Sequence, residues 1–328
     1  MQLPFSYDDI LNVNEHNFNE IALEIFRFQA NNNQCYADYL KYINVSPISV
    51  TNCEDIPYLP ISFFKTHTVL SKASSKDKLH YFESSSTTGM GTSKHFYEDI
   101  RWYVKAFNKA FQQFYGDISS SHVIALLPNY MTNKHSSLLY MVDDLIKQSA
   151  TKSTGYYLDN HDDLIDQLKR NEENGIPTIL FGVSYALLDA HTDITFNHLT
   201  IIETGGMKGR RKEITRNELH DVIKRNFKGA KIHSEYGMTE LFSQAYLQAD
   251  TLFKTPNWMK VSIRQLDDPF SGEIYNKNGL IHVADLANIE SCSFIATSDI
   301  GKMYKDGRFE VLGRFDHSEQ RGCNLLIT

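Results

Sequence analysis

The sequence predicts an α/β fold: a doubly wound, mostly parallel sheet with helices on both faces, followed by a β-rich subdomain. Two observations predict it. Between residues 122 and 234, short apolar runs alternate with amphipathic segments of helical period, which is typical of βαβ units. After about residue 245, short β-like runs are separated by Asp-Pro, Ser-Gly and Asp-Gly turns. We therefore expect an α/β body over residues 1–244 and a β-rich subdomain over residues 245–328.

The composition is that of a globular protein with a substantial core. Of its 328 residues, 41% are hydrophobic and 22% are charged. The net charge of −7 and the pI near 6.0 argue against a nucleic-acid-binding surface, which would be basic. We expect no membrane span, because no apolar run approaches the roughly 18 residues that a span needs, and the N-terminus lacks the pattern of a signal peptide.

The cysteines also indicate a compartment. Cys35, Cys53, Cys292 and Cys323 are widely scattered and form no CxxC pair. This favours free thiols in a reducing cytosol over a disulfide framework or a zinc site, so we expect a cytoplasmic protein.

The pattern of apolar residues and prolines in the N-terminal region predicts two helices and an extended segment. Apolar residues recur at helical spacing over residues 15–43, with a break at Asn31–Asn33. In residues 56–65, Pro57 and Pro60 are incompatible with a regular helix, so an extended apolar strap is expected there.

A hydroxyl-rich loop follows a predicted strand at residues 80–83. Residues 84–94 contain five consecutive Ser and Thr residues, two glycines and Lys94, which is a set of groups suited to binding phosphate. The spacing is not that of a Walker P-loop, and a solvated Ser/Gly turn is the alternative. Residues 101–115 then predict an amphipathic helix that Gly116 ends.

The alternating region completes the predicted sheet. Strands are expected at residues 122–127, 178–181, 199–203 and 231–234, and helices at 136–147, 162–171, 184–190 and 213–227. The β-like runs beyond them are 260–265, 280–283, 294–296 and 309–312. Ligands of such sheets bind beyond the carboxyl ends of the strands. The Gly205-Gly206 turn and the stretch Tyr236–Glu240 both directly follow a predicted strand, where a nucleotide site is expected.

The chemistry of Tyr236-Gly237-Met238-Thr239-Glu240 suits a magnesium–nucleotide. Tyr236 offers a flat face for a base, Gly237 allows a sharp turn or a close approach, Thr239 offers a hydroxyl donor and Glu240 offers a hard oxygen ligand. The alternative is a strand-to-helix turn in which Thr239 caps the helix and Tyr236 fills the core.

Four motifs in order resemble those of the adenylate-forming superfamily of acyl- and aryl-CoA ligases. Residues 84–89 resemble its phosphate loop, 236–240 its adenine and magnesium motif, 297–301 its ribose-binding motif, and 313–316 the motif that ends its large domain. The closer resemblance is to the acyl-protein synthetase (LuxE) family, known from the fatty-acid reductase of bacterial luminescence. Residues 57–65, 126–128, 136–138, 234–240 and 321–323 carry it.

This resemblance implies ATP as substrate, Mg²⁺ as cofactor and a role for each matching residue. It implies that Ser86, Thr87, Thr88 and Gly89 hold the phosphates, and that Gly205 and Gly206 line the adenine. It further implies that Tyr236, with Gly237 and Met238, stacks on the adenine, that Thr239 contacts the α-phosphate, that Glu240 holds Mg²⁺, that Asp299 binds the ribose and that Arg314 lies near the ribose or phosphate. The ordinary alternatives are a turn residue at Asp299 and a surface ion pair at Arg314.

The sequence departs from the superfamily in three places. Ser86 stands where the phosphate loop usually has glycine, and the lysine of the loop falls late, so neither Lys94 nor Lys208 is assigned as a catalytic lysine. CoA ligases also continue beyond the position of Arg314 with a small domain that supplies such a lysine. Here the sequence ends shortly after Arg314, so we expect no separate small C-terminal domain.

In the LuxE family, a cysteine near the C-terminus accepts the acyl group as a thioester, and Cys323 matches that position. A thiolate is a suitable nucleophile for an acyl-adenylate, and the neighbouring Arg321 would favour the thiolate. The alternative is a closing strand over residues 321–328 that carries a passive thiol.

The predicted function is therefore an ATP-dependent acyl-protein synthetase. It would activate a carboxylic acid, expected to be a fatty acid, and pass the acyl group from Cys323 to an acyl-CoA-reductase-like protein or an acyl carrier. Two alternatives stay open: a stand-alone CoA or amine ligase that uses an external acceptor, and a nucleotide-binding module without turnover.

Overall fold

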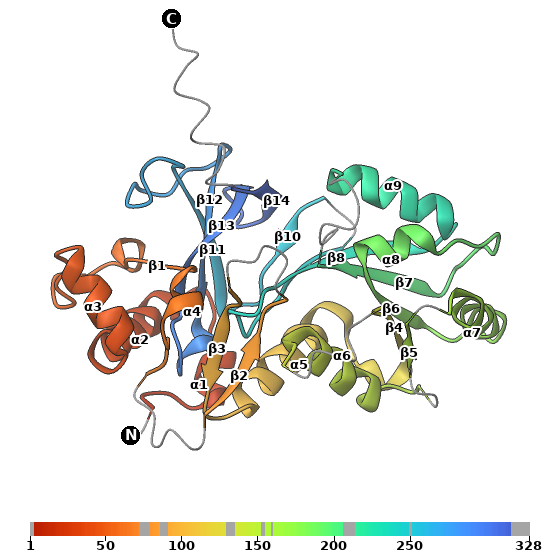
Figure 1. The fold of residues 1–328 in the computed structure, drawn as a ribbon, viewed down its shortest axis with the longest axis horizontal. Coiled ribbons are helices and arrows are strands. Elements are labelled where there is room, and N and C mark those ends of the chain that lie inside the picture. Colours follow the sequence, from red (N-terminus) through yellow and green to blue (C-terminus); the bar gives the residue numbers. More distant parts are fainter. Residues whose placement is uncertain are drawn as a thin grey trace, which may run out of the picture. The chain divides into compact units, whose positions relative to one another are not determined.

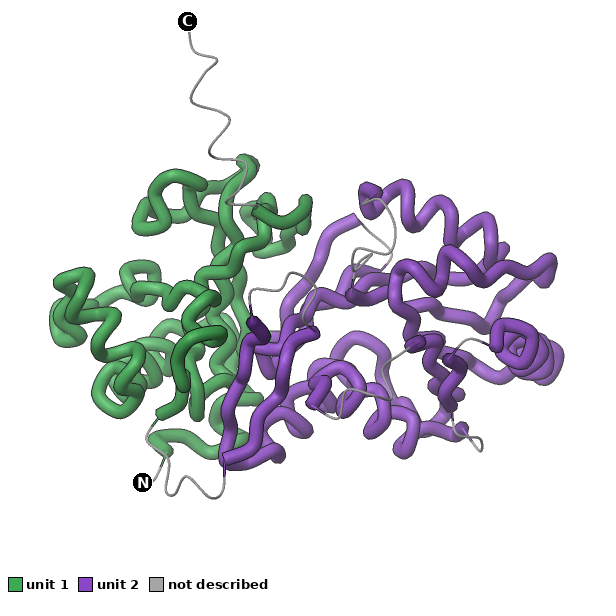
Figure 2. The backbone as a smooth tube through the Cα atoms, in the orientation of Figure 1, with its two compact units in different colours: residues 1–78, 257–328 green, residues 79–256 purple. Residues whose placement is uncertain are grey.

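The computed structural model describes residues 3–71, 79–85, 91–128, 135–151, 155–158, 160–205, 214–248 and 251–315 (Figure 1). The chain forms two compact units (Figure 2). The first combines residues 1–78 with residues 257–328, and the second is continuous over residues 79–256. This division differs from the single boundary that the sequence suggests between residues 244 and 245, because the N-terminal helices belong with the C-terminal strands.

The second unit is built on a sheet of the predicted class. Five strands are parallel, in the spatial order β5-β4-β6-β7-β8: β4 (His122–Leu126), β5 (Tyr156–Tyr157), β6 (Thr178–Val183), β7 (Leu199–Thr204) and β8 (Lys231–Tyr236). Two further strands extend it antiparallel beyond β8: β9 (Ala245–Leu247) and β10 (Phe253–Lys254). The strand order reverses between β4 and β6, so ligand binding is expected beyond the carboxyl ends of the central strands.

Helices cover both faces of this sheet (Figure 1). Helices α5 (Arg101–Tyr115) and α6 (Ser137–Gln148) lie on one face, and α8 (Ser184–Asp189) and α9 (Arg216–Asn226) lie on the other. Helix α7 (His161–Glu173) packs beside β5, and a short 3₁₀ helix, η3 (Ile118–Ser120), precedes β4. All six residues of β6 are buried, as expected of a parallel strand between two helical layers.

The end of β6 differs from the prediction that Gly182 terminates the strand. The strand continues through Gly182 to Val183. A side chain at Gly182 would meet Leu187 of α8, since a Cβ atom there would lie 2.5 Å from Leu187 Cδ2. The glycine therefore allows α8 to pack closely on the strand and does not break it.

Helix α5 has the predicted bounds. Its apolar face buries Trp102, Tyr103, Ala106, Phe107, Ala110 and Phe111, and Gly116 ends the helix with φ at 75°. Helix α9 begins at a capping box between Thr215 and Glu218, which satisfies two backbone N–H groups of its first turn.

A separate two-stranded sheet in this unit brackets the hydroxyl loop. Strand β2 (His80–Glu83) pairs antiparallel with β3 (Lys94–Tyr97), and Glu83 lies opposite Lys94. The predicted phosphate loop is thus the connection of a β-hairpin.

The first unit contains the N-terminal helices and an antiparallel sheet. Its N-terminal elements are α1 (Tyr7–Leu11), α2 (Phe18–Asn32), α3 (Gln34–Tyr42), η1 (Cys53–Asp55), β1 (Leu59–Pro60) and α4 (Phe63–Thr66). Its C-terminal elements are β11 (Met259–Arg264), β12 (Asn278–Asp285), η5 (Leu286–Asn288), β13 (Phe294–Met303) and β14 (Phe309–Arg314). Strands β11 to β14 pair antiparallel in order, and β1 pairs parallel with β13.

The break between the first two long helices is confirmed, and the strap is confirmed in part. Asn33 separates α2 from α3, and its side chain accepts from the backbone of Tyr36 as an N-cap. The strap is extended at β1, but helix α4 begins at Phe63 because no proline follows Pro60 to prevent it. No helix in the described ranges is long and apolar enough to cross a membrane.

Candidate active site

Gly205 and Tyr236 stand level with each other at the carboxyl ends of two neighbouring parallel strands. Glu203 of β7 lies opposite Ser234 of β8, so the register continued by two residues brings Gly205 beside Tyr236. Gly205 has φ at 81°, a conformation that other residues rarely adopt. The predicted adenine-lining turn and adenine-stacking ring therefore occupy one edge of the sheet. Gly206 lies outside the described residues.

The stretch Gly237–Glu240 is a turn between two strands. Thr239 and Glu240 lie in this turn, Leu241 donates its N–H to the Met238 carbonyl at 3.1 Å, and the chain returns as β9, antiparallel to β8. The part of the alternative in which Thr239 caps a helix is thus wrong, whereas the part that places Tyr236 in the core is confirmed, because Tyr236 is buried. A Cβ atom at residue 237 would lie 2.2 Å from Glu235 Oε1, so the glycine leaves room for the Glu235 carboxylate in its observed position.

The hydroxyl loop is closed at its base by two hydrogen bonds between Ser84 and Ser93. Ser84 donates its backbone N–H to the Ser93 carbonyl at 3.0 Å, and Ser93 donates its own to Ser84 Oγ at 2.9 Å. Lys94 Nζ lies 4.0 Å from Glu83 Oε1, on the stem of the hairpin. The predicted phosphate-binding residues Ser86, Thr87, Thr88 and Gly89 lie outside the described residues.

His95 joins this hairpin to the turn after β8. Its Nδ1 lies 2.9 Å from the Thr239 carbonyl oxygen, and its ring stacks on Phe242 with centroids 4.5 Å apart. Burial lowers the pKa of His95 to about 4, although the bond to Thr239 opposes this shift, so the ring is neutral near pH 7. Because a carbonyl only accepts, Nδ1 carries the proton. The stem of the hydroxyl loop and the Thr239 turn are therefore held together.

His95 was missed in the sequence. The alternation of β3 contained a signal, because His95 and Tyr97 share the buried side of the strand, but nothing local indicated which turn His95 contacts.

Glu240 can serve a metal only together with other ligands. Its side chain is buried, and the described ranges contain no group of three or more His, Cys, Asp or Glu residues that could hold a metal. Magnesium commonly takes one or two carboxylates and completes its shell with phosphates and water. A single carboxylate therefore fits Mg²⁺ that binds with a nucleotide, and it does not fit a cage made of protein ligands alone.

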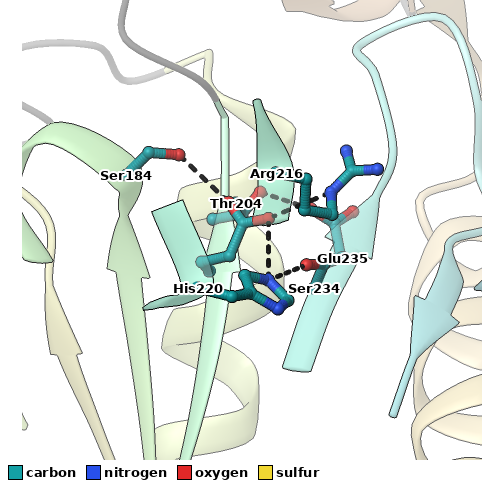
Figure 3. A network of polar contacts seen from close by, with 7 residues as sticks. Ser184, Thr204, Arg216, His220, Ser234 and Glu235 are labelled. Carbon is teal, nitrogen blue, oxygen red and sulfur yellow. Dashed lines mark hydrogen bonds and ion pairs between the residues drawn. The ribbon is translucent and has the colours of Figure 1, made fainter. Parts of the chain in front are cut away.

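Five polar side chains meet behind this edge and are here called the Glu203 cluster: Ser184, Glu203, Arg216, His220 and Ser234. Ser184, Glu203 and Ser234 are buried, whereas Arg216 and His220 are partly exposed. Figure 3 shows this polar network, with Ser184, Arg216, His220 and Ser234 labelled. Glu203 accepts from Ser184 Oγ at 3.0 Å, and its Oε1 lies 3.6 Å from Arg216 Nε and 3.8 Å from His220 Nε2. Burial favours a raised pKa for Glu203, but the neighbouring His220, Arg216 and Ser234 outweigh it and hold the pKa below its ordinary value. Glu203 is thus a buried carboxylate.

The Glu203 cluster is not a Ser-His-acid catalytic triad. His220 Nε2 lies 2.8 Å from Ser234 Oγ, but the same nitrogen also faces Glu203, and Ser234 is fully buried. A Ser-His-acid triad uses opposite ring nitrogens for its two partners and exposes the serine. The sequence contained no local signal for this cluster, because its members come from four elements.

Glu235 projects from the other side of β8. The Thr204 hydroxyl donates to its carboxylate. Burial raises the pKa of Glu235 to about 7, and the charge of Glu203 adds to this effect while the Thr204 bond opposes it. A carboxyl group that changes charge near neutral pH therefore lies one residue before the predicted adenine ring.

The two predicted ribose-site residues meet in the first unit. Asp299 of β13 is the register partner of Arg314 at the end of β14, and Arg314 Nε lies 3.9 Å from Asp299 Oδ1. The Arg314 side chain is 73% exposed, and that of Asp299 is 19% exposed. Asp299 lies within a strand, so its interpretation as a turn residue is wrong.

The described cysteines are poor nucleophiles. Burial raises the pKa of Cys35 and of Cys53 to about 11, and that of Cys292 to about 12. All three are protonated thiols at neutral pH. Cys323 lies outside the described residues.

The structure is similar to solved adenylate-forming ligases. Residues of the chain superpose on 2-hydroxyisobutyryl-CoA ligase in the postadenylation state with a TM-score of 0.63 at 10% identity, covering 96% of this chain and 72% of that one. Superposition on ATP-bound MatB from Rhodopseudomonas palustris gives 0.51 at 15% identity, covering 71% and 47%. Superposition on AMP-bound O-succinylbenzoate CoA synthetase (MenE) from Bacillus subtilis gives 0.50 at 17% identity, covering 73% and 49%. The chain thus spans about half the length of the last two.

These similarities establish the fold, and the family comes from the sequence. No curated protein matches the chain. The model of the acyl-protein synthetase family, LuxE, matches residues 2–328, which is nearly the whole chain. The chain therefore belongs to the LuxE acyl-protein synthetase family.

Proposed function

We propose that this protein activates a carboxylic acid with ATP and transfers the acyl group through Cys323 to a partner. The observation that carries the proposal is the contact between His95 and Thr239. This contact joins the stem of a hydroxyl-rich loop to the turn that follows β8. The segment suited to binding phosphate is therefore held next to the segment suited to binding adenine. Membership of the LuxE family supports the same reaction.

In the first step, a carboxylate oxygen of the acid attacks the α-phosphorus of ATP. The new P–O bond forms as the bond between the α-phosphorus and the bridging oxygen breaks, and pyrophosphate leaves. The backbone at Gly205, the Tyr236 ring and the Thr239 hydroxyl bind and orient the nucleotide, and Asp299 and Arg314 bind its ribose and phosphate. Mg²⁺ held by Glu240 together with the phosphates would supply charge stabilisation.

In the second step, the Cys323 thiolate attacks the carbonyl carbon of the acyl-adenylate. A thioester forms, AMP leaves, and the thiol proton is released to solvent. The raised pKa values of Cys35, Cys53 and Cys292 support this assignment, because a protonated thiol reacts slowly and Cys323 is the remaining cysteine. A fatty acid is the proposed substrate, and an acyl-CoA-reductase-like protein or an acyl carrier is the proposed acceptor.

The two steps are separated by Cys323→Ser. The variant is expected to keep acid-dependent ATP–pyrophosphate exchange within about twofold of the wild type, because adenylation precedes the thiol, and to lose labelling by radioactive acid that hydroxylamine removes. Cys53→Ser is the matched control and should keep both activities. A panel of fatty and aromatic acids in the exchange assay identifies the acid.

Each alternative predicts a different result. Hydroxylamine-labile labelling of Cys323→Ser would contradict the thioester at Cys323. Formation of acyl-CoA at the same rate with and without Cys323 would indicate a ligase with an external acceptor. Tight ATP binding without exchange for any acid would indicate a nucleotide-binding module.

A further inference from the structure

We propose that Glu203, Arg216 and Phe253 form a positioning chain that holds the Tyr236 ring in place for the adenine of ATP. This inference rests on the proposed binding of ATP at Tyr236, and it assigns to three side chains a role that the LuxE motifs do not include. All four residues belong to the second unit.

The first member of the positioning chain is the Glu203 carboxylate, whose position and charge are both fixed. Glu203, at the carboxyl end of β7, is anchored by Ser184 at the start of α8 and by His220 of α9, and its lowered pKa keeps it ionised at neutral pH. A buried carboxylate with several partners has little freedom to move. It therefore provides a rigid acceptor for the first turn of α9.

Arg216, at the first position of α9, contacts both Glu203 and Phe253. Its Nε lies 3.6 Å from Glu203 Oε1, while the centre of its guanidinium lies 4.6 Å from the centroid of the Phe253 ring. A guanidinium is planar and can pair with a carboxylate along its edge while one face covers an aromatic ring. The ammonium group of lysine offers no such face.

Phe253 contacts the Tyr236 ring and limits its movement. Its ring is fully buried and meets the Tyr236 ring edge-on, with centroids 5.9 Å apart and an angle of 61° between the planes. Phe253 is held in β10, opposite Leu247 of β9. The Tyr236 ring is therefore bounded on one side by an aromatic ring that Arg216 itself holds.

Such a chain would affect the affinity for ATP. A ring that is already oriented loses less conformational freedom when a base stacks on it, so preorganisation increases the affinity. The acid does not stack on Tyr236 in the proposed reaction, and its affinity should be unaffected. Arg216 and Phe253 are thus positioning residues and not catalytic residues.

The test is a double-mutant cycle on the full-length protein. Arg216→Lys retains the charge beside Glu203 but loses the planar face, and Phe253→Leu removes the ring. Calorimetric titration with ATP in buffered Mg²⁺ is expected to show each variant binding about fivefold to tenfold more weakly, with the double variant no weaker than about the worse single one, since the two residues act in series. Arg225→Lys, at an exposed arginine of the same helix, is the matched control and should bind as the wild type does.

A readout other than affinity separates positioning from general destabilisation. In pyrophosphate exchange, the KM for ATP should rise in Arg216→Lys while the KM for the acid stays unchanged, and the midpoint of thermal unfolding should stay within a few degrees of the wild type. Two results would contradict the positioning chain: losses of ATP affinity that multiply in the double variant, or equal rises in the KM for ATP and the KM for the acid. Neither result would contradict the proposal that the protein binds ATP. A wild-type protein that does not bind ATP would overturn both proposals.

Discussion

At the residue scale, the alternation of β8 separates two kinds of acidic environment. Ser234 faces His220, another member of the Glu203 cluster, whereas Glu235 projects to the opposite side, where Thr204 donates to it. Glu203 has compensating partners and a lowered pKa, whereas Glu235 has few and a pKa near 7. Two carboxyl groups on adjacent strands therefore differ in charge below neutral pH.

Glu235→Gln is expected to change how stability depends on pH. In the wild type, the raised pKa means that the folded state binds more protons than the unfolded state between about pH 4.5 and 7, so the free energy of unfolding falls as pH rises through this window. Glutamine does not titrate, so the variant should gain about 1 to 3 kcal/mol relative to the wild type between pH 5 and pH 8.5. Urea unfolding at several pH values measures this gain.

A matched control for this measurement is Glu24→Gln, at an exposed position of α2. Its stability relative to the wild type should vary little with pH. A relative stability of Glu235→Gln that is equally flat would show that Glu235 ionises at its ordinary pKa in the folded protein.

At the element scale, the β13–β14 hairpin combines two arginine–aspartate pairs with different expected roles. Arg314 and Asp299 lie in the predicted ribose and large-domain motifs. Arg308 and Asp306 lie at the hairpin turn, where Arg308 Nη2 is 2.7 Å from Asp306 Oδ2. Exposed ion pairs contribute little to stability. The comparison of the two arginines therefore separates ligand binding from folding.

Arg314→Ala should leave the free energy of unfolding within about 0.5 kcal/mol of the wild type, because the side chain is exposed and its partner is 3.9 Å away. It should weaken ATP binding about tenfold, the loss expected for one charge-assisted contact to the ribose or phosphate. Calorimetric titration with ATP and urea unfolding measure the two effects.

Arg308→Ala provides the control, since it removes the other pair of the same hairpin. It is expected to leave both quantities unchanged. Equal ATP affinity in the wild type and Arg314→Ala would support the simpler interpretation of Arg314 as a surface ion pair.

At the scale of the whole molecule, one unit is assembled from the two ends of the sequence. Gln29 of α2 donates to the carbonyls of Asn288 and Ile289 at 3.0 and 3.1 Å, and its Oε1 accepts the Ser293 N–H at 3.0 Å. Phe26 packs edge-on against Phe294, with centroids 6.3 Å apart. The fully buried Gln29 amide thus provides hydrogen-bond partners for backbone groups of a loop more than 250 residues away in the sequence.

Gln29→Leu is expected to lower the free energy of unfolding by more than about 3 kcal/mol, because two carbonyls and one N–H would lose their partner in a buried environment. Urea unfolding monitored by tryptophan fluorescence measures the loss. Asn31→Ala is the control and should change stability by about 0.5 kcal/mol or less, because this exposed amide donates to the Arg27 carbonyl within its own helix. A loss below about 1 kcal/mol in Gln29→Leu would indicate that water replaces the amide.

The sequence by itself determined the fold class and the order of most of the longer helices and strands, and it predicted where nucleotide motifs lie. These depend on local regularities: helix α5 shows an uninterrupted helical period and a terminal glycine, and the turn after β8 has its predicted nucleotide-binding side chains on adjacent positions. Local interactions are sufficient to predict such features because the residues that make them are neighbours in the chain.

Only the tertiary structure decided which distant residues meet. The sequence misplaced the end of β6, because whether a glycine ends a strand or admits a helix depends on Leu187 in the next element. It contained no sign that His95 would contact Thr239, that Arg216 would cover Phe253, or that Gln29 would join the C-terminal strands. A buried polar side chain is stable only with a partner, and folding brings that partner from any part of the chain.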